Sequence, residues 1–223
     1  NSRIAFRVVV LPLAVPPQIS MDWPFSIASQ RYDIISGDIV LKRIMSSGVN
    51  GFSRNRRIVN EDALWNALVV DMAMGGSSNT VLHMLAIARE AGVALDLAAI
   101  ERVAGRVAHV AKIAPSLSTV HIEDVGRAGG VSAVLHEVAR RGDVVRTAAL
   151  TVTGETIGDR IRQAEAVDRG VIRHLDDPYS KVGGIAILRG NLAPDGAVVK
   201  TAGVDRKMLR GEGPARIFDS EER

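Results

Sequence analysis

The 223-residue sequence contains no cysteine. Disulfides, cysteine nucleophiles, zinc–thiolate sites and thiolate-held iron–sulfur clusters are therefore excluded from this chain. Aromatic residues make up only 4% of the sequence, and basic residues (28) exceed acidic residues (25) by three. The densest basic cluster, Arg54, Arg56 and Arg57, has no aromatic residue between its arginines. Nucleic-acid binding, which relies on basic surfaces and stacked aromatic rings, is therefore not expected.

Long hydrophobic runs are also missing. The apolar run from Val8 to Val15 is interrupted by Pro12 and is shorter than the roughly 20 residues that a membrane-spanning helix requires. Arg3 and Arg7 precede this run as they would in a signal peptide, but no small-residue cleavage pattern follows it. We therefore expect a cytoplasmic protein without a membrane contact.

The overall composition, with 47% hydrophobic and 24% charged residues, is that of an ordinary globular protein. Residues 1–57 form a poorly matching N-terminal segment, because repeated prolines interrupt it and its apolar residues keep no sustained period. The stretch from Asp33 to Met45 is an exception that fits a helix or a strand, and Gly37 leaves that choice open.

Four amphipathic patterns bounded by capping residues predict helices in the next part of the chain. They run from Asn60 to the Gly75–Gly76 pair, from Ser77 to Gly92, from Asp96 to about Val107, and from Gly130 to Arg141. In the second of these helices, the predicted apolar stripe comprises Val81, Leu82, Leu85, Ala86 and Ala88.

The pattern changes after Val171. Residues 183–191 and 195–203 are short β-prone runs bounded by turn residues, which indicates that a mostly β region begins here. Between the two regions, residues 158–168 are rich in charge and poor in large apolar side chains. This stretch is predicted to be a linker or an exposed helix.

One segment could bind an anion. The sequence Gly75-Gly-Ser-Ser-Asn-Thr-Val-Leu-His83 joins a flexible turn to a polar helix start, where free backbone N–H groups and short polar side chains point outward. An ordinary glycine turn followed by a helix cap explains the same residues. His83 is similarly open to interpretation as a surface or core histidine instead of a catalytic base.

No other pattern names a reaction. The five histidines, at positions 83, 109, 121, 136 and 174, have no metal-ligand spacing. The adjacent acidic pairs Glu123–Asp124 and Asp176–Asp177 are better explained as solvated caps, since neighbouring side chains point in different directions. Nucleophile-elbow, phosphate-loop and dinucleotide-binding motifs are all absent.

Several motifs nevertheless occur together in one order. They are Gly75-Gly-Ser-Ser-Asn-Thr-Val-Leu-His, Glu123-Asp-Val-Gly-Arg-Ala-Gly-Gly, Val152-Thr-Gly-Glu-Thr, the long run from Gly183 to Asp205, and Gly213-Pro-Ala-Arg-Ile-Phe-Asp-Ser-Glu-Glu222. On these motifs, residues 58 to 222 resemble the family of dihydroxy-acid and sugar-acid dehydratases. The residues Asn79-Thr-Val-Leu-His favour the dihydroxy-acid branch over the 6-phosphogluconate branch. Ser78 and Gly126 depart from the threonine and histidine that the family generally has there.

The resemblance implies a reaction that converts a 2,3-dihydroxy acid into a 2-oxo acid and water in branched-chain amino-acid biosynthesis. It also implies an iron–sulfur cluster at the leaving hydroxyl, Mg²⁺ at the carboxylate end and a serine that removes the C2 proton. In the family these ligands and this serine lie outside the motifs quoted above, and none of them maps onto this chain. We therefore expect no catalytic and no metal-binding residue here.

By the same resemblance, the expected fold is α/β. Residues 58–165 would be part of the N-terminal α/β dehydratase domain, and residues 166–223 would open a swivelling β-barrel domain that is cut short. Ser77, Ser78 and Asn79 are the predicted substrate-binding residues, as polar donors at a helix start near the anionic end of the ligand.

Three functions follow as alternatives. The first is an internal fragment of a dihydroxy-acid dehydratase that is inactive alone, and the second is a fragment of an aldonate or 6-phosphogluconate dehydratase. The third is a non-catalytic interaction partner of a full-length paralogue. Family members associate as dimers or tetramers, so a homo-oligomer is expected. An incomplete barrel would leave open strand edges, so we also expect the chain to self-associate.

Overall fold

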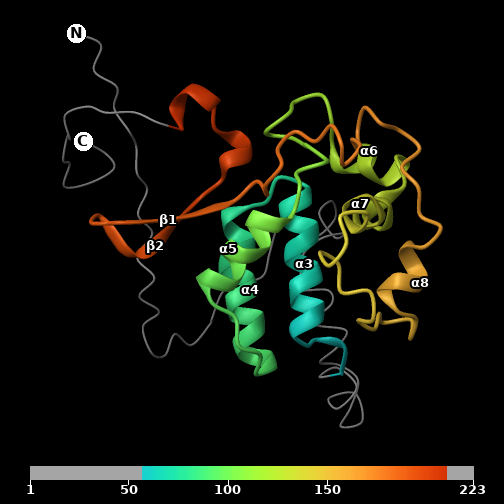
Figure 1. Ribbon diagram of the computed structural model, residues 1–223, viewed down its shortest axis with the longest axis horizontal. Coiled ribbons are helices and arrows are strands. Elements are labelled where there is room, and N and C mark those ends of the chain that lie inside the picture. Colours follow the sequence, from blue (N-terminus) through green and yellow to red (C-terminus); the bar gives the residue numbers. More distant parts are fainter. Residues whose placement is uncertain (1–56, 210–223) are drawn as a thin grey trace, which may run out of the picture.

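Helix α3 (Glu61–Ala73) lies at the centre of the fold, between the other long helices (Figure 1). The computed structural model describes residues 57–209. The side chain of Asn60 accepts a hydrogen bond from the Ala63 N–H group and so caps the start of α3. The acidic residues Glu61 and Asp62 occupy the first turn, where they suit the helix dipole. The first predicted helix is confirmed.

The next two predicted helices are also confirmed. Helix α4 (Ser78–Ala91) begins after Ser77 and ends at Gly92, which takes the left-handed conformation with φ of 69°. Helix α5 (Leu97–Arg106) begins after Asp96, whose carboxylate accepts a hydrogen bond from the Ala99 N–H group. These boundaries follow from capping chemistry that the sequence displays directly.

The predicted apolar stripe of α4 is partly wrong. Val81 and Ala88 are buried, but Leu82 is 43% exposed and Ala86 is exposed, whereas Met84 is buried. The inward positions therefore follow the spacing 81, 84 and 88, one narrow line on the helix surface, and Leu82 and Ala86 lie beside it.

Three further helices follow. Helix α7 (Gly130–Ala139) matches the fourth predicted helix. Helix α6 (Ile122–Arg127) was not predicted, because it is only six residues long and contains Gly126. Helix α8 (Ile157–Ile161) occupies the start of the charged stretch that was predicted to be a linker or an exposed helix.

The two β-prone runs form a hairpin. Strand β1 (Ala186–Gly190) pairs with β2 (Ala193–Val199) in antiparallel register, with Ile187 opposite Val198. Two 3₁₀ helices, η1 (Thr201–Gly203) and η2 (Arg206–Met208), follow the hairpin. Within residues 57–209 this two-stranded sheet accompanies the helices, so a mixed α and β chain is confirmed. The barrel remains a prediction.

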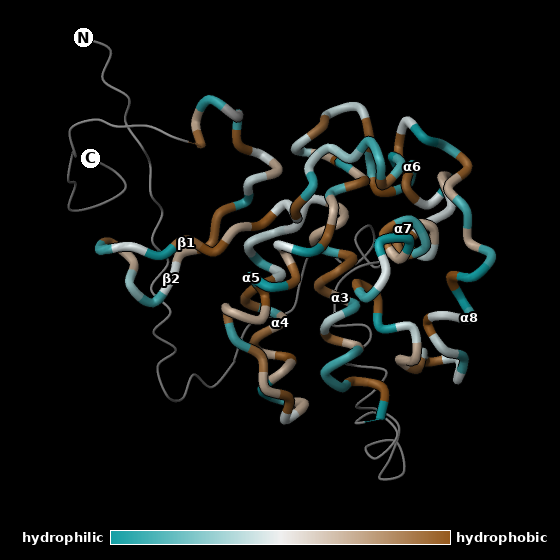
Figure 2. The backbone as a smooth tube through the Cα atoms, in the orientation of Figure 1, coloured by the Kyte–Doolittle hydropathy of each residue, from teal (hydrophilic) through white to brown (hydrophobic). Residues whose placement is uncertain are grey.

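A single hydrophobic core joins the helices to the segment that leads into the hairpin. Its members include fully buried side chains of α3, α5 and α7 together with two residues from the later part of the chain: Leu68, Met72, Ile100, Val103, Val134, Ile172 and Ile185. Hydrophobic segments gather where these helices approach one another, whereas the outer end of the hairpin is hydrophilic (Figure 2). The core therefore includes residues on both sides of residue 165, and the domain boundary expected there stays a prediction.

Residues 57–209 contain no helix that is both long enough and apolar enough to cross a membrane. The predictions for residues 1–56, including the helix or strand at 33–45, lie outside the described residues, as does the motif from Gly213 to Glu222.

Candidate functional site

Two of the glycine-rich motifs meet in the structure. Gly75 and Gly76 form a turn between α3 and α4 with positive φ angles of 96° and 66°, which side chains disfavour. Gly183 and Gly184 pack directly against this turn and the end of α3. A Cβ atom on Gly184 would lie 2.2 Å from the Gly75 carbonyl oxygen, so only glycine fits. We call these four residues the glycine junction.

Backbone hydrogen bonds hold the glycine junction together. The Gly184 N–H group donates to the Met72 carbonyl at 3.3 Å, and the Gly183 N–H group donates to the Ala104 carbonyl at 2.7 Å. The Ala202 N–H group donates to the Gly184 carbonyl at 3.1 Å. The junction therefore fixes η1 and the start of the hairpin against the ends of α3 and α5.

The three predicted substrate-binding residues lie beside the glycine junction at the start of α4. Ser77 is half-buried, and its Oγ accepts a hydrogen bond from the Asn79 N–H group at 3.3 Å. Ser78 and Asn79 are exposed. His83 is also exposed on α4, as a surface histidine would be. The contact of Ser77, Ser78 and Asn79 with a substrate stays a prediction.

Asp71, near the end of α3, is a site residue that the sequence patterns did not reveal. Its Oδ1 accepts a hydrogen bond from the Thr80 hydroxyl at 2.8 Å, while its buried Oδ2 has no hydrogen-bond partner among the described residues. Burial raises the pKa of the Asp71 carboxyl, against the opposing effects of the Thr80 hydroxyl, the Ser77 N–H group and Lys200. The start of α4 therefore already faces a carboxylate of the same chain.

His109 is the second residue that sequence reasoning missed. It is 3% exposed, and a Cβ atom on Gly75 would lie 2.9 Å from its Nε2. Nε2 lies 3.2 Å from the Ala111 carbonyl, which can only accept, so Nε2 carries the proton. Burial lowers the pKa of His109 to about 4, and the charges of Lys112 and Lys200 act in the same direction. The imidazole is therefore neutral at pH 7.

The first of the two acidic pairs caps a helix, as predicted, whereas the second is exposed but caps none of the described helices. The Asp124 carboxylate accepts from the His121 N–H group at 2.8 Å and from Arg127 Nη1 at 2.8 Å, at the start of α6. Asp176 and Asp177 are exposed. Neither pair converges on a reaction centre.

The side chains present do not fit the iron–sulfur cluster that the resemblance implies. An iron–sulfur cluster needs thiolate ligands in this family, and the chain has no cysteine. The chain therefore has no thiolate that could hold a cluster. Across residues 57–209, no three His, Asp or Glu side chains come close enough together to hold a metal ion.

Comparison with known proteins follows the same motifs. The family model described as dihydroxy-acid/6-phosphogluconate dehydratase N-terminal matches residues 29–160, and the corresponding C-terminal model matches residues 170–223. The glycine junction thus brings together one motif from each matched region.

Curated relatives share most of this sequence. The dihydroxy-acid dehydratase of Anaeromyxobacter sp. strain Fw109-5 is 72% identical over 169 residues, which is 76% of this chain and 30% of that protein. The dihydroxy-acid dehydratase of Wolinella succinogenes is 53% identical over 181 residues, which is 81% of this chain and 32% of that protein. The chain thus spans about 30% of the length of the curated relatives it matches. Because the N-terminal model alone covers more than half of its residues, this chain belongs to the dihydroxy-acid/6-phosphogluconate dehydratase family of hydro-lyases.

Proposed function

We propose that this chain is the part of a dihydroxy-acid dehydratase that contacts the substrate away from the metal centre. The observation that carries the proposal is the 72% identity to a dihydroxy-acid dehydratase over 169 residues. The reaction of the whole enzyme would convert a 2,3-dihydroxy acid into a 2-oxo acid and water, in the biosynthesis of branched-chain amino acids. The enzyme would work in the cytoplasm as a dimer or tetramer.

The chain alone is proposed to be inactive. Hydroxide is a poor leaving group and the C2 proton of the substrate is weakly acidic, so both must be polarised by positive charge. In the family an iron–sulfur cluster and Mg²⁺ supply that charge. This chain has no thiolate for the cluster, and its described residues bring no cluster of carboxylates together for the metal.

Ser77, Ser78 and Asn79 are the proposed substrate contacts. The glycine junction supports this role, because it holds the turn before α4 against the segment that leads into the hairpin. Ser78 and Asn79 are exposed at the first turn of α4, where their side chains are free to donate hydrogen bonds to hydroxyl or carboxylate oxygens. The hairpin is proposed to be the opening of the family's β-barrel domain.

A titration of the full chain tests the proposal. We expect 2,3-dihydroxy-3-methylbutanoate to bind saturably, followed by amide chemical shifts, and we expect no 2-oxo acid to form. Asn79→Ala should weaken binding about threefold, a loss of about 0.6 kcal/mol that suits one exposed hydrogen bond. Asn191→Ala, at the exposed turn of the hairpin, is the matched control and should leave binding unchanged. Absence of saturable binding would reject the proposal.

A sugar-acid dehydratase is the second candidate, because the matching family models include 6-phosphogluconate dehydratases. Tighter binding of gluconate or 6-phosphogluconate than of the branched dihydroxy acid in the same titration would favour it. A third role, as a non-catalytic partner of a full-length paralogue, predicts that the tagged chain enriches such an enzyme in a pull-down.

A further inference from the structure

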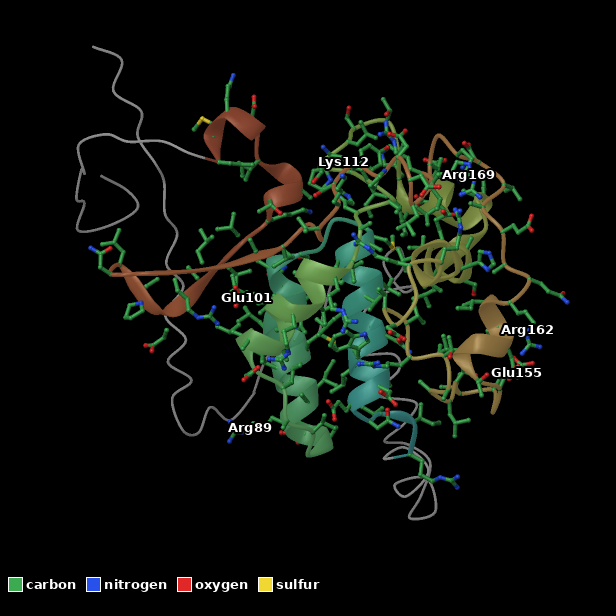
Figure 3. The ribbon with its side chains drawn as sticks, in the orientation of Figure 1. Arg89, Glu101, Lys112, Glu155, Arg162 and Arg169 are labelled. Carbon is green, nitrogen blue, oxygen red and sulfur yellow. The ribbon has the colours of Figure 1, made fainter. Side chains whose placement is uncertain are left out.

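A cavity of about 510 Å³ lies between two segments that are far apart in the sequence. One wall is the loop that follows His109 and contains Lys112 and Ser116, and the other is the segment after β2 that contains Lys200, Gly203 and Asp205. Figure 3 shows Lys112 beside the segment that carries η1. The space is open to solvent, and its volume falls within the range of small-molecule sites, about 300–1,000 Å³. We call this space the lysine cavity.

The backbone on both sides of the lysine cavity is fixed. Ala111, next to Lys112, donates its N–H group to the Ala73 carbonyl at 3.0 Å. Ala202, two residues after Lys200, donates to Gly184 of the glycine junction at 3.1 Å. The two lysines are therefore anchored to the same end of α3, one from each of the regions that match the two family models.

The lysine cavity carries net positive charge. Asp205 is the acidic residue in its lining, and its Oδ2 lies 3.4 Å from the Nζ of Lys207, so that lysine already balances it. Neither Lys112 nor Lys200 forms an ion pair with a carboxylate of residues 57–209. Both ammonium groups also lower the pKa of the buried His109, so both lie close enough to act on the same imidazole.

A larger cavity of about 830 Å³ next to Trp65 has no net charge in its lining. Its lining holds three acidic side chains and three arginines: Glu61, Asp62, Glu101, Arg102, Arg106 and Arg146. Arg146 stacks over the Trp65 ring at 4.7 Å and pairs with Asp62, and Glu101 pairs with Arg189. Counted over the lining alone, these charges sum to zero, whereas the two lysines of the lysine cavity outnumber its one carboxylate.

We propose that the lysine cavity binds the anionic group of a small ligand, a carboxylate or a phosphate, between the ammonium groups of Lys112 and Lys200. The Ser116 hydroxyl would donate a hydrogen bond to the same group. The start of α4 already faces the Asp71 carboxylate, which would repel an anion bound there. The two lysines are therefore better placed than that helix end to hold the anionic group of a ligand.

Anion titrations of the full 223-residue chain at low ionic strength test the inference. The probes are inorganic phosphate, 2,3-dihydroxy-3-methylbutanoate and the neutral amide of that acid. We expect both anions to bind, and the amide to bind at least tenfold more weakly than the acid. Lys112→Gln and Lys200→Gln should each weaken anion binding about tenfold, the effect of removing one close charge. Lys112→Arg and Lys200→Arg should retain binding, and thermal melts should verify that each variant folds.

Lys181→Gln is the matched control, because Lys181 is exposed and lies outside the cavity lining, and it should leave affinity within twofold. Lysine-dependent binding of phosphate without binding of the dihydroxy acid would support the anion site and reject the proposed function. Dihydroxy-acid binding that is unchanged in both glutamine variants would overturn the anion site and leave the proposed function standing. An equal loss in the control variant, or no binding of either anion, would also overturn the inference.

Discussion

Gly184 touches its neighbour so closely that a single methyl group would not fit. Its added Cβ atom would lie 2.2 Å from the Gly75 carbonyl oxygen and 2.5 Å from the Gly75 Cα atom, both in the backbone. Backbone atoms cannot rotate away as a flexible side chain can. We therefore expect Gly184→Ala to lower the free energy of unfolding by about 3 kcal/mol, the upper end of overpacking effects.

Chemical denaturation of Gly184→Ala and of a control glycine variant measures this effect. Gly190→Ala is the control, because a Cβ atom on Gly190 at the end of β1 meets nothing within 4 Å. That variant should change the free energy of unfolding by less than about 0.5 kcal/mol. Equal stabilities for the two variants would show that the glycine junction is looser than described.

His109 makes the stability of the fold depend on pH in mildly acidic solution. An unfolded histidine takes up its proton near pH 6.5, whereas His109 in the fold does so only near pH 4. The unfolded state therefore binds more protons in this window, and stability is lost as the pH falls from about 6.5 to about 4. The shift corresponds to about 3 kcal/mol.

Thermal melts between pH 7 and pH 4 check this expectation. His109→Gln cannot take up a proton, so it should lose most of the decrease, while its amide can still donate to the Ala111 carbonyl. His83→Gln, at an exposed position of α4, should keep the wild-type profile. If the profile of His109→Gln matches that of the wild type, another group is responsible.

Helix α7 is attached to the chain beyond α8 through one buried carboxylate. Glu137 is 1% exposed and accepts hydrogen bonds from Arg140 at 2.6 Å, Arg169 at 2.6 Å and the Leu175 N–H group at 2.8 Å. Burial alone would raise the pKa of Glu137, but these donors outweigh it and hold the pKa below its usual value. Arg169 lies close to α6 and α7 in Figure 3.

Removing this carboxylate should release the segment at 169–175 from α7. We expect Glu137→Ala to cost about 3 kcal/mol in unfolding free energy and to increase hydrogen exchange at Leu175. Glu155→Ala is the control, since Glu155 is more than half exposed in its pair with Arg160 and such surface pairs contribute about 0–1 kcal/mol. A cost for Glu137→Ala no larger than that of the control would contradict the assigned role.

The elements that the sequence predicted well are those with local boundary chemistry. Asn60, Ser77 and Asp96 cap helices from within a few residues, and Gly92 ends one, so each boundary is visible in a short window. The hairpin was visible for the same reason, since turn residues separate its β-prone runs. The short helix α6 has too few residues to set up a period.

The candidate site was harder to predict because tertiary contacts assemble it. Asp71 and Thr80 flank the glycine turn and meet only when α3 and α4 fold back on each other. Lys112 and Lys200 are ordinary isolated lysines in the sequence and share a cavity only through the glycine junction. Ser77, Ser78 and Asn79 stand out in the sequence because they follow a double glycine in one short motif.

At the scale of the whole molecule, the hairpin exposes two leucines. Leu188 is 51% exposed and Leu192 is 80% exposed, and within residues 57–209 the two strands pair only with each other. Unpaired strand edges with exposed apolar side chains favour association between chains. We expect the mass of the full chain in analytical ultracentrifugation to rise with concentration, in line with the predicted oligomer.

Charged substitutions on the hairpin test this expectation. The double variant Leu188→Lys, Leu192→Lys should shift the chain toward the monomer by introducing repulsion along the exposed edge. Val167→Lys, at a side chain that is 77% exposed outside the hairpin, should not change the mass. A wild-type chain that stays monomeric at every concentration would contradict the predicted association.

The shared hydrophobic core has a consequence for how the molecule comes apart. Ile172 and Ile185 belong to the region matched by the C-terminal family model, yet both are fully buried among side chains of α3, α5 and α7. Arg162, Gln163 and Glu165, which bridge the two matched regions, are exposed. A protease that cuts the chain there would break the covalent link. The two pieces would stay associated through the shared core and would unfold in one transition.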